Sequence, residues 1–414
     1  MKRAIILGGT YPHRHLIEKL KERGYFTILV DYLESPIAKD VADKHIQEST
    51  LDMDKVADIA KEEGASLVIS TCVDQANVTC CYVGEKLGLP HPYSYKASIN
   101  VTDKVAMKRI MVDKDIPTSR HYVITDVDQF AEKKLSYPII VKPADSNSSK
   151  GVRRIDEGDE NALDYIKKAL EISRNGAAVI EEYKVGKEVG VDCMIKDHKA
   201  HVIMTRERRK IQSNNDSIQQ IYGSFWPADI TPFQNDALQK IAEKIAEAFE
   251  LDNTPLMMQT IVSDEEINVI EFGARIGGGE NYHIIHELTG YDIIDQSINS
   301  FLGDEIDLTY REPQEYLADN YIYAEPKVFG RMEIKQNVIG KVLYANVYRK
   351  KGALLGKDIS SNNRVGVFVV KDKSTVGLLE KISDVINAME VYDIDGNPMM
   401  RKDIYGYDTF NNSF

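Results

Sequence analysis

The first hundred residues alternate short aliphatic runs with amphipathic stretches. An apolar run at Arg3–Leu7 is followed by an amphipathic stretch at 16–23, and the same order recurs twice more before residue 88. Strands that alternate with helices in this way form a parallel sheet with helices on its faces. The alternation therefore predicts an α/β domain over residues 1–100.

Length, composition and charge restrict the class of protein. A chain of 414 residues exceeds the size at which one hydrophobic core keeps growing, so we expect several packed domains. The net charge of −13 disfavours nonspecific binding to nucleic acid or to an anionic membrane. Apolar runs are too short to cross a bilayer, and the four cysteines lack the spacing of a metal site or a disulfide framework. We expect a cytoplasmic protein without nucleic-acid or membrane partners.

Changes in pattern along the chain predict four segments. They are an N-terminal α/β domain at 1–100, a linker helix with a small mobile lid at 101–186, a larger subdomain with a metal site at 187–312, and a small α+β domain at 313–414. The linker helix is predicted over 102–114, capped by Thr102. A second helix is predicted to start at Thr231-Pro232 and to run through Glu250, because a cap followed by proline is typical of a helix start.

A lysine placed between a buried strand and a polar turn is the first candidate for chemistry. Lys142 follows Ile139-Ile140-Val141 and precedes Pro143. An ammonium fixed there could act in catalysis by neutralising a transferring phosphate, while backbone N–H groups of the following turn surround its oxygens. The turn supplies Ser146, Ser148, Ser149 and Gly151 as candidates, and Lys104 in the linker helix is a further phosphate candidate. The alternative is a solvated lysine beside an ordinary surface turn.

The segment after the next strand has the pattern of a nucleotide-binding crossing. Two apolar runs flank a short charged stretch, whose exposed backbone could bind a purine while a carboxylate accepts from ribose hydroxyls. The candidate residues are Glu181, Glu182, Lys184 and Glu188. A hairpin with charged residues facing water gives the same pattern.

Oxygen ligands for a cation are predicted near residue 271. Glu271 lies between an apolar run and a glycine-rich stretch, and Gln259 lies on the preceding predicted strand. Mg²⁺ needs few protein oxygens when substrate phosphates and water complete its shell. Arg275 could then bind a planar anion through two N–H groups. For Glu271 and Arg275 the alternative is a charged strand edge with a surface ion pair. Further substrate candidates are Arg206, Arg208, Gly277 and Gly278, and the alternative for the two arginines is a solvated charged face.

Taken in chain order, these residues resemble the ATP-grasp superfamily, in its carboxylate–amine ligase branch of L-amino-acid ligases and biotin-carboxylase-like enzymes. The resemblance implies an ATP-grasp fold: an N-terminal preATP-grasp domain with a parallel sheet, a small mobile lid and a C-terminal α+β subdomain. It also implies ATP with Mg²⁺, or with Mn²⁺ in its place, and a homodimer. The chain departs from the family motif Glu-x-Asn-x-Arg at Gly273, which removes an expected metal ligand.

The same resemblance implies a role for each candidate. Lys104 and Lys142 would contact phosphates, and Glu181 the adenine amino group. Main chain near Glu182 and Lys184 would meet the ring. The remaining implied contacts are Glu188 with ribose, Gln259 and Glu271 with the metal, and Arg275 with the phosphate or acyl phosphate.

The leading functional hypothesis is a ligase that joins a small-molecule carboxylate to a small-molecule amine through an acyl phosphate. Such chemistry depends on positioning and charge neutralisation and needs no side-chain nucleophile. A purine-pathway or carbamoyl-phosphate-type ligase is the alternative within the superfamily. Gly8-Gly9 after the first strand and Asp31 after the second also fit an NAD-linked dehydrogenase, and an ATP-binding sensor is a further alternative.

Overall fold

The computed structural model describes residues 1–146, 150–211, 220–357 and 363–405. The chain forms two compact units, each assembled from three stretches of sequence. The first unit contains 1–118, 190–205 and 230–312, and the second contains 119–189, 206–229 and 313–414. Strands β9 (Lys187–Lys196) and β10 (Lys199–Lys210) contribute residues to both units. Within the described residues, no helix has the length and apolar character needed to cross a membrane.

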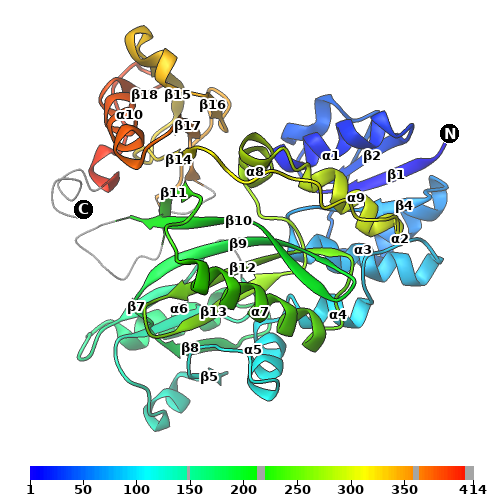
Figure 1. The fold of residues 1–414 in the computed structure, drawn as a ribbon, viewed down its shortest axis with the longest axis horizontal. Helices are drawn as coiled ribbons and strands as arrows, with labels where there is room; N and C mark the ends of the chain where they lie inside the picture. The colour runs from blue at the N-terminus through cyan, green and yellow to red at the C-terminus, as the bar shows by residue number, and fades with distance from the viewer. Residues whose placement is uncertain (147–149, 212–219, 358–362, 406–414) are drawn as a thin grey trace. The chain divides into compact units, whose positions relative to one another are not determined.

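The first unit begins with the predicted parallel α/β sheet, drawn in blue in Figure 1. Its strands, in the spatial order β3-β2-β1-β4, are β1 (Arg3–Leu7), β2 (Phe26–Asp31), β3 (Lys44–Gln47) and β4 (Leu67–Ile69). Its helices are α1 (Tyr11–Glu22), α2 (Met53–Glu62) and α3 (Asp74–Leu87). Sequence analysis missed β3, because a lysine, a histidine and a glutamine among its four residues hide the apolar pattern of a strand.

The rest of the first unit surrounds an antiparallel pair of strands, β12 (Thr254–Val262) and β13 (Ile267–Gly273). Its helices are α4 (Tyr95–Asn100), α5 (Lys104–Asp113), α7 (Pro232–Ala248), α8 (Asn281–Thr289) and α9 (Ile293–Leu302). Helix α7 begins where it was predicted, with the Thr231 hydroxyl accepting the Gln234 N–H at 3.2 Å. Helix α5 starts two residues later than predicted, and its cap is one residue later: the Asp103 carboxylate, not Thr102, accepts the Ala106 N–H at 2.8 Å.

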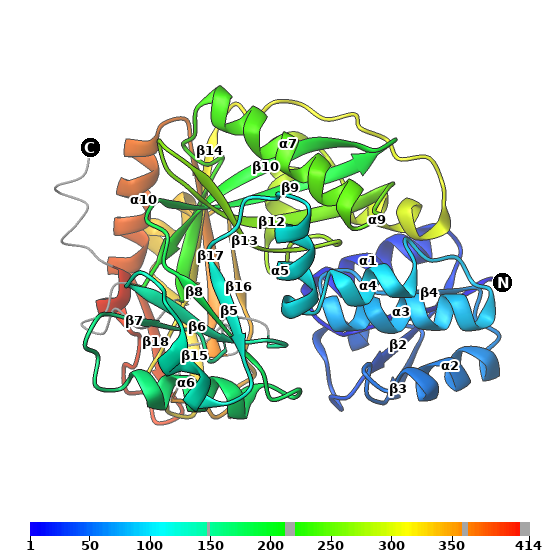
Figure 2. The same cartoon turned by 90° about the horizontal axis from the view of Figure 1, so that it is seen from below.

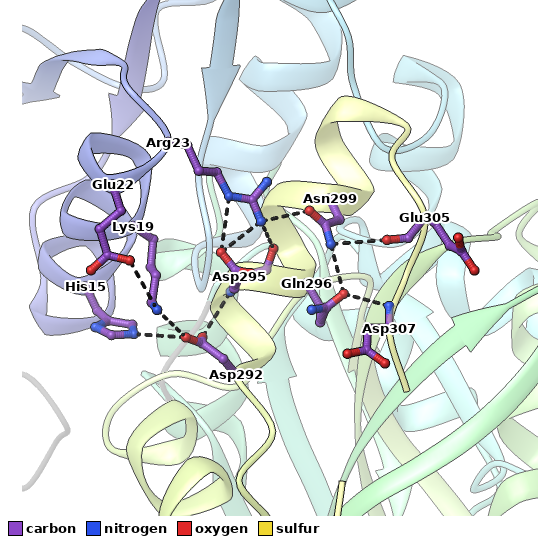
Figure 3. A network of polar contacts seen from close by, with 10 residues as sticks. All are labelled: His15, Lys19, Glu22, Arg23, Asp292, Asp295, Gln296, Asn299, Glu305 and Asp307. Atoms are coloured by element: carbon purple, nitrogen blue, oxygen red, sulfur yellow. Dashed lines mark hydrogen bonds and ion pairs between the residues drawn. The ribbon is translucent and has the colours of Figure 1, made fainter. Parts of the chain in front are cut away.

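Helices α1 and α9 are joined by a network of polar contacts (Figure 3). Arg23 donates through Nη2 to Asn299 at 2.8 Å and also pairs with Asp295. Lys19 lies 3.0 Å from Asp292, which caps the start of α9. Burial by itself would raise the pKa of Asp292, but hydrogen bonds from His15, from the backbone of Asp295 and from Lys19 hold it well below its usual range. These contacts fix α1 against α9.

The second unit contains a small antiparallel sheet with one helix on its face (Figure 2). The strands, in the order β5-β8-β6-β7, are β5 (His121–Ile124), β6 (Ile139–Pro143), β7 (Arg153–Ile155) and β8 (Ala178–Glu182). Helix α6 (Ala162–Ile172) packs on β6, and Ile139, Val141 and Ile180 form a buried cluster with Ile166 of the helix. Because side chains alternate along a strand, Lys142 points to the opposite face.

The remainder of the second unit combines the predicted α+β tail with one strand from segment 206–229. Four antiparallel strands lie in the order β11-β14-β17-β16, and two more form a separate pair. These strands are β11 (Ile221–Trp226), β14 (Tyr316–Ile322), β16 (Tyr344–Val347) and β17 (Gly366–Asp372), with β15 (Phe329–Ile334) and β18 (Met389–Asp393) as the pair. Helix α10 (Thr375–Asn387) packs on β17. Short 3₁₀ helices occur at Ile37–Asp40, Val127–Glu132, Gln336–Lys341 and Lys402–Tyr405.

Candidate functional site

Strands β12 and β13 bring a carboxylate and an amide together in the first unit. Glu271 and Gln259 are direct partners across the antiparallel ladder, so their side chains share one face of the sheet. The Nζ atom of Lys104, the first residue of α5, lies 3.5 Å from Glu271 Oε2. We name Lys104, Gln259, Glu271 and Arg275 the Glu271 cluster. It combines oxygen donors suited to a cation with an ammonium suited to a phosphate.

The oxygen donors of the Glu271 cluster fit Mg²⁺ under one condition. Among the described residues, no three or more His, Cys, Asp or Glu side chains gather into a metal-binding group. Mg²⁺ accepts one or two protein oxygens when phosphates and water supply the rest of its octahedral shell. Glu271 and Gln259 therefore suit a cation that arrives with a nucleotide, and Mn²⁺ has the same ligand preference.

Arg275 lies just after β13, and its guanidinium is held on one edge. Its Nε and Nη2 atoms donate to the two carboxylate oxygens of Asp74 at 2.8 and 2.7 Å, and Nη1 donates to the Ile276 carbonyl at 2.9 Å. Burial by itself would lower the pKa of Arg275, but the charge and hydrogen bonds of Asp74 raise it, so the guanidinium stays charged. Sequence analysis gave Asp74 no role.

The two glycines predicted to meet substrate have different surroundings. A Cβ atom on Gly277 would lie 1.8 Å from Asn281 Nδ2 and 2.9 Å from Asp192 Oδ1, so this glycine allows the close approach of two buried polar side chains. The nearest atom to a Cβ on Gly278 would be Cys72 Cβ at 4.0 Å. Packing thus explains Gly277, whereas Gly278 has room beside it.

A buried ion pair marks the second group of candidates, which lies in the second unit. Lys142 Nζ is 2.7 Å from Glu181 Oε1, and the two side chains are only 5% and 6% exposed. Both residues belong to neighbouring strands, β6 and β8, on the face opposite α6. We name Lys142 and Glu181 the Lys142 cluster. Two predicted nucleotide contacts are therefore adjacent to each other.

The turn after Lys142 is described only at its two ends. Ser146 donates from its hydroxyl to the Lys150 carbonyl at 3.2 Å. Gly151 has a φ of +77°, and a Cβ there would lie 2.8 Å from the Ile172 side chain. Ser148 and Ser149, both predicted to bind phosphate, lie outside the described residues.

Segment 183–186 joins β8 to β9, as the predicted crossing requires. Glu188, at the start of β9, accepts from Arg208 Nη1 at 2.5 Å and pairs with Lys210 at 3.2 Å. The structure therefore brings together a residue predicted for ribose and one predicted for substrate. The Tyr183 ring lies under the Arg154 guanidinium at 4.8 Å.

The other candidates of the second unit are placed as follows. Glu182 accepts the Ser136 N–H at 3.1 Å, and Lys184 is partly exposed within segment 183–186. Arg206 is buried, with its guanidinium 5.1 Å above the Trp226 ring. Trp226 in turn donates from Nε1 to Asp319 at 2.8 Å.

A family model for the ATP-grasp domain matches residues 135–282, which include Lys142, Glu181, Glu271 and Arg275. Residues 135–282 are therefore similar to an ATP-grasp domain. Lys104 lies outside the matched region. The predicted resemblance is thereby confirmed.

Comparison with solved structures shows the same fold over nearly the whole chain. The L-amino acid ligase from Bacillus licheniformis superposes with a TM-score of 0.77 at 17% identity, covering 95% of this chain and 99% of that one. The biotin carboxylase domain of 2-oxoglutarate carboxylase from Hydrogenobacter thermophilus, solved with MgADP, ADP and bicarbonate, gives a TM-score of 0.75 at 17% identity over 96% and 91% of the two chains. The chain therefore has the ATP-grasp fold.

Curated relatives match over shorter regions. The formate-dependent phosphoribosylglycinamide formyltransferase from Ignicoccus hospitalis is 26% identical over 190 residues, which are 44% of this chain and 46% of the relative. The chain spans less than half the length of the first curated relatives that it matches.

One buried polar group had no assigned role in the sequence analysis. His13 on α1 accepts the Thr10 N–H at Nδ1 (3.3 Å), and its Nε2 lies 3.2 Å from the Ser70 hydroxyl. Ser70 donates to the Leu7 carbonyl, so its oxygen accepts from Nε2–H and fixes one neutral tautomer. Burial lowers the pKa of His13 to about 3. Gly8 provides space for this ring, because a Cβ there would lie 2.9 Å from two of its atoms.

Proposed function

We propose that this chain is an ATP-dependent carboxylate–amine ligase. The observation that carries the proposal is the Glu271 cluster: oxygen donors for a cation, an ammonium and a guanidinium gathered within an ATP-grasp fold. Each of these groups acts by placing charge, and phosphoryl transfer needs positioning and charge neutralisation above all. The likeness to an L-amino acid ligase supports the same class of reaction.

In the proposed reaction, a carboxylate oxygen of the substrate attacks the γ-phosphorus of ATP, and ADP leaves. The amine then attacks the acyl carbon of the acyl phosphate, phosphate departs with the bonding electron pair, and the nitrogen loses a proton. Lys104 stabilises the charge on the transferring phosphoryl group, and Arg275 holds the phosphate or the acyl phosphate. Mg²⁺ held by Glu271 and Gln259 would neutralise phosphate oxygens.

The Lys142 cluster would bind the nucleoside end of ATP. Glu181 would accept from the adenine amino group. Because Lys142 Nζ lies 2.7 Å from Glu181 Oε1, Lys142 would contact the phosphate nearest the nucleoside, since the γ-phosphate is too far from the purine. This assignment separates Lys142 from Lys104, which serves the transferring group. Glu188 would accept from ribose hydroxyls, backbone at Glu182 and Lys184 would meet the purine ring, and the turn containing Ser146, Ser148, Ser149 and Gly151 would surround phosphate oxygens.

A second candidate is a ligase that uses a phosphorylated or bicarbonate substrate. Two comparisons favour it: one relative is a formate-dependent phosphoribosylglycinamide formyltransferase, and one similar structure was solved with bicarbonate. Both candidates share the proposed ATP contacts and differ in the acceptor.

A matrix of carboxylates and amines, scored for ADP release with Mg²⁺ present, tests the proposal. We expect ADP release that depends on a carboxylate, and hydroxamate formation when hydroxylamine replaces the amine. ADP release stimulated by phosphoribosyl compounds or bicarbonate, and not by amino acids, would favour the second candidate. Nucleotide binding without any acceptor-dependent ADP release would contradict both and indicate a sensor.

A further inference from the structure

The guanidinium of Arg275 is held so that only part of it remains available to a ligand. Of its five N–H groups, two are taken by Asp74 along the Nε–Nη2 edge and one by the Ile276 carbonyl. Counting contacts with the described residues, one N–H on each terminal nitrogen therefore remains. A bidentate carboxylate on one edge fixes the plane of a guanidinium, so Asp74 determines where these two N–H groups point.

Asp74 is itself fixed by the fold. It is the first residue of α3, which follows β4 in the N-terminal parallel sheet. The start of a helix stabilises a carboxylate through the partial positive charge of its free N–H groups. The side chains of Asp74 and Arg275 are 21% and 14% exposed, so solvent competes only weakly for their contact. The first residue of α3 thus orients a residue that lies just after β13.

Gly273 provides the space for this carboxylate. A Cβ atom there would lie 2.6 Å from Asp74 Oδ1 and 3.3 Å from Arg275 Nε. The φ angle of Gly273 lies outside the left-handed region, so the backbone would accept another residue. The obstacle to a side chain is therefore the Asp74 carboxylate, which explains why the chain departs from the family motif at this position.

We propose that Asp74 is a positioning residue that orients Arg275 toward the transferred phosphoryl group, and that Gly273 keeps the space for its carboxylate. The positioning role rests on the proposed function, because it assigns Arg275 to the phosphate or acyl phosphate. The packing relation among the three residues does not depend on that function.

The packing relation is tested by thermal unfolding of Gly273→Ala in two backgrounds. In the wild-type background the added methyl group meets Asp74 Oδ1, so Tm falls. In the Asp74→Ala background this clash is absent, and the fall shrinks to less than half. Gly340→Ala is the matched control, because no atom lies within 4 Å of its added Cβ. Equal effects of Gly273→Ala in both backgrounds would overturn the proposal.

The positioning role is tested by a cycle of Asp74→Ala, Arg275→Ala and the double variant. Because Asp74 acts through Arg275, the single Asp74 variant lowers kcat for ADP release about tenfold or more, and the double variant is no slower than Arg275→Ala. Affinity for ATP without acceptor stays within about twofold of wild type, which a merely unfolded protein would not show. Additive losses in kcat would overturn the role.

Two further variants keep these outcomes separable. Asp74→Asn retains the volume and one acceptor oxygen but places an amide N–H₂ against Nη2, so it lowers kcat even where Asp74→Ala folds poorly. Asp54→Asn removes an exposed carboxylate paired with Lys86 and leaves kcat unchanged. A wild-type protein without acceptor-dependent ADP release would refute the proposed function. In that case the Tm of the same three variants is compared. Asp74→Ala causes no further fall in Tm when Arg275 is already alanine, and additive falls would overturn the proposed contact between Asp74 and Arg275.

Discussion

The ion pair of Lys142 and Glu181 is almost completely buried, so removing one partner leaves the other charge without its partner in a medium of low polarity. We predict that Lys142→Ala lowers the free energy of unfolding by about 3 kcal/mol. The double variant Lys142→Met/Glu181→Leu regains most of this loss, because two apolar side chains replace both charges. Urea unfolding measures the stability, and neither variant binds ATP under the proposed function.

An exposed pair provides the control for this measurement. Lys86 and Asp54, with side chains 44% and 74% exposed, lie 2.6 Å apart, and Lys86→Ala is expected to change stability by less than about 1 kcal/mol. If Lys142→Met/Glu181→Leu were as unstable as Lys142→Ala, the loss of stability would not come from an uncompensated buried charge. The buried pair also rules out the alternative given for Lys142, a solvated lysine beside an ordinary surface turn.

His13 makes the stability of the protein depend on pH. Its folded pKa of about 3 lies below the unfolded value of 6.5, so the unfolded state binds more protons between these two pH values. Stability therefore rises with pH through this window and falls on acidification, by up to about 1.4 kcal/mol per pH unit from this group. We predict that His13→Gln flattens the dependence measured by urea unfolding at pH 4 to 7. The same substitution at the exposed His198 serves as control. If stability depends on pH as steeply in His13→Gln as in wild type, His13 is not the origin of the dependence.

Contacts between helices explain how the N-terminal sheet is fixed within the first unit. Arg23, directly after α1, bonds to both Asp295 and Asn299 on α9 (Figure 3). We predict that Arg23→Ala increases amide hydrogen exchange in α9 and leaves α7 unchanged, because the lost contacts all lie on α9. The expected loss of stability is about 1 kcal/mol for this partly exposed group. Faster exchange in both helices to the same degree would indicate global destabilisation instead.

The network also has a pH dependence of its own. The folded pKa of Asp292 lies below its unfolded value, so its contribution to stability is present at neutral pH and is lost as the pH falls through the folded pKa.

Helices and strands differed in how far their sequences revealed them. Helix α7 was predictable because a cap, a proline and a repeat of buried side chains coincide, among them Leu238, Ile241 and Ile245. Strand β3 was not, since it pairs in parallel with β2 through its backbone and carries few apolar side chains. Backbone pairing leaves no side-chain pattern, so short polar strands are missed by periodicity.

The candidate site was predictable where strand ends place polar residues and unpredictable where distant segments meet. Gln259 and Glu271 were found because both lie on apolar strands, and the ladder pairs them. Asp74 meets Arg275 across 201 positions of sequence, and no local pattern encodes that contact. The sequence offered one indication that Asp74 could belong to a site: its carboxylate follows a strand of the parallel sheet, where ligands of α/β folds commonly bind.

Nucleotide binding should stabilise the whole protein, because a ligand that binds only the folded state shifts the unfolding equilibrium. At a concentration about 100 times Kd, a nonhydrolysable ATP analogue with Mg²⁺ should add about 2.7 kcal/mol. We predict that Glu271→Gln, which keeps the volume and removes the charge, abolishes the part of this stabilisation that depends on Mg²⁺. Calorimetry with and without Mg²⁺ measures the difference. Glu305→Gln is the control and should behave as wild type, because the Glu305 side chain is 89% exposed. A Mg²⁺-dependent stabilisation that persists in Glu271→Gln would show that Glu271 does not hold the cation.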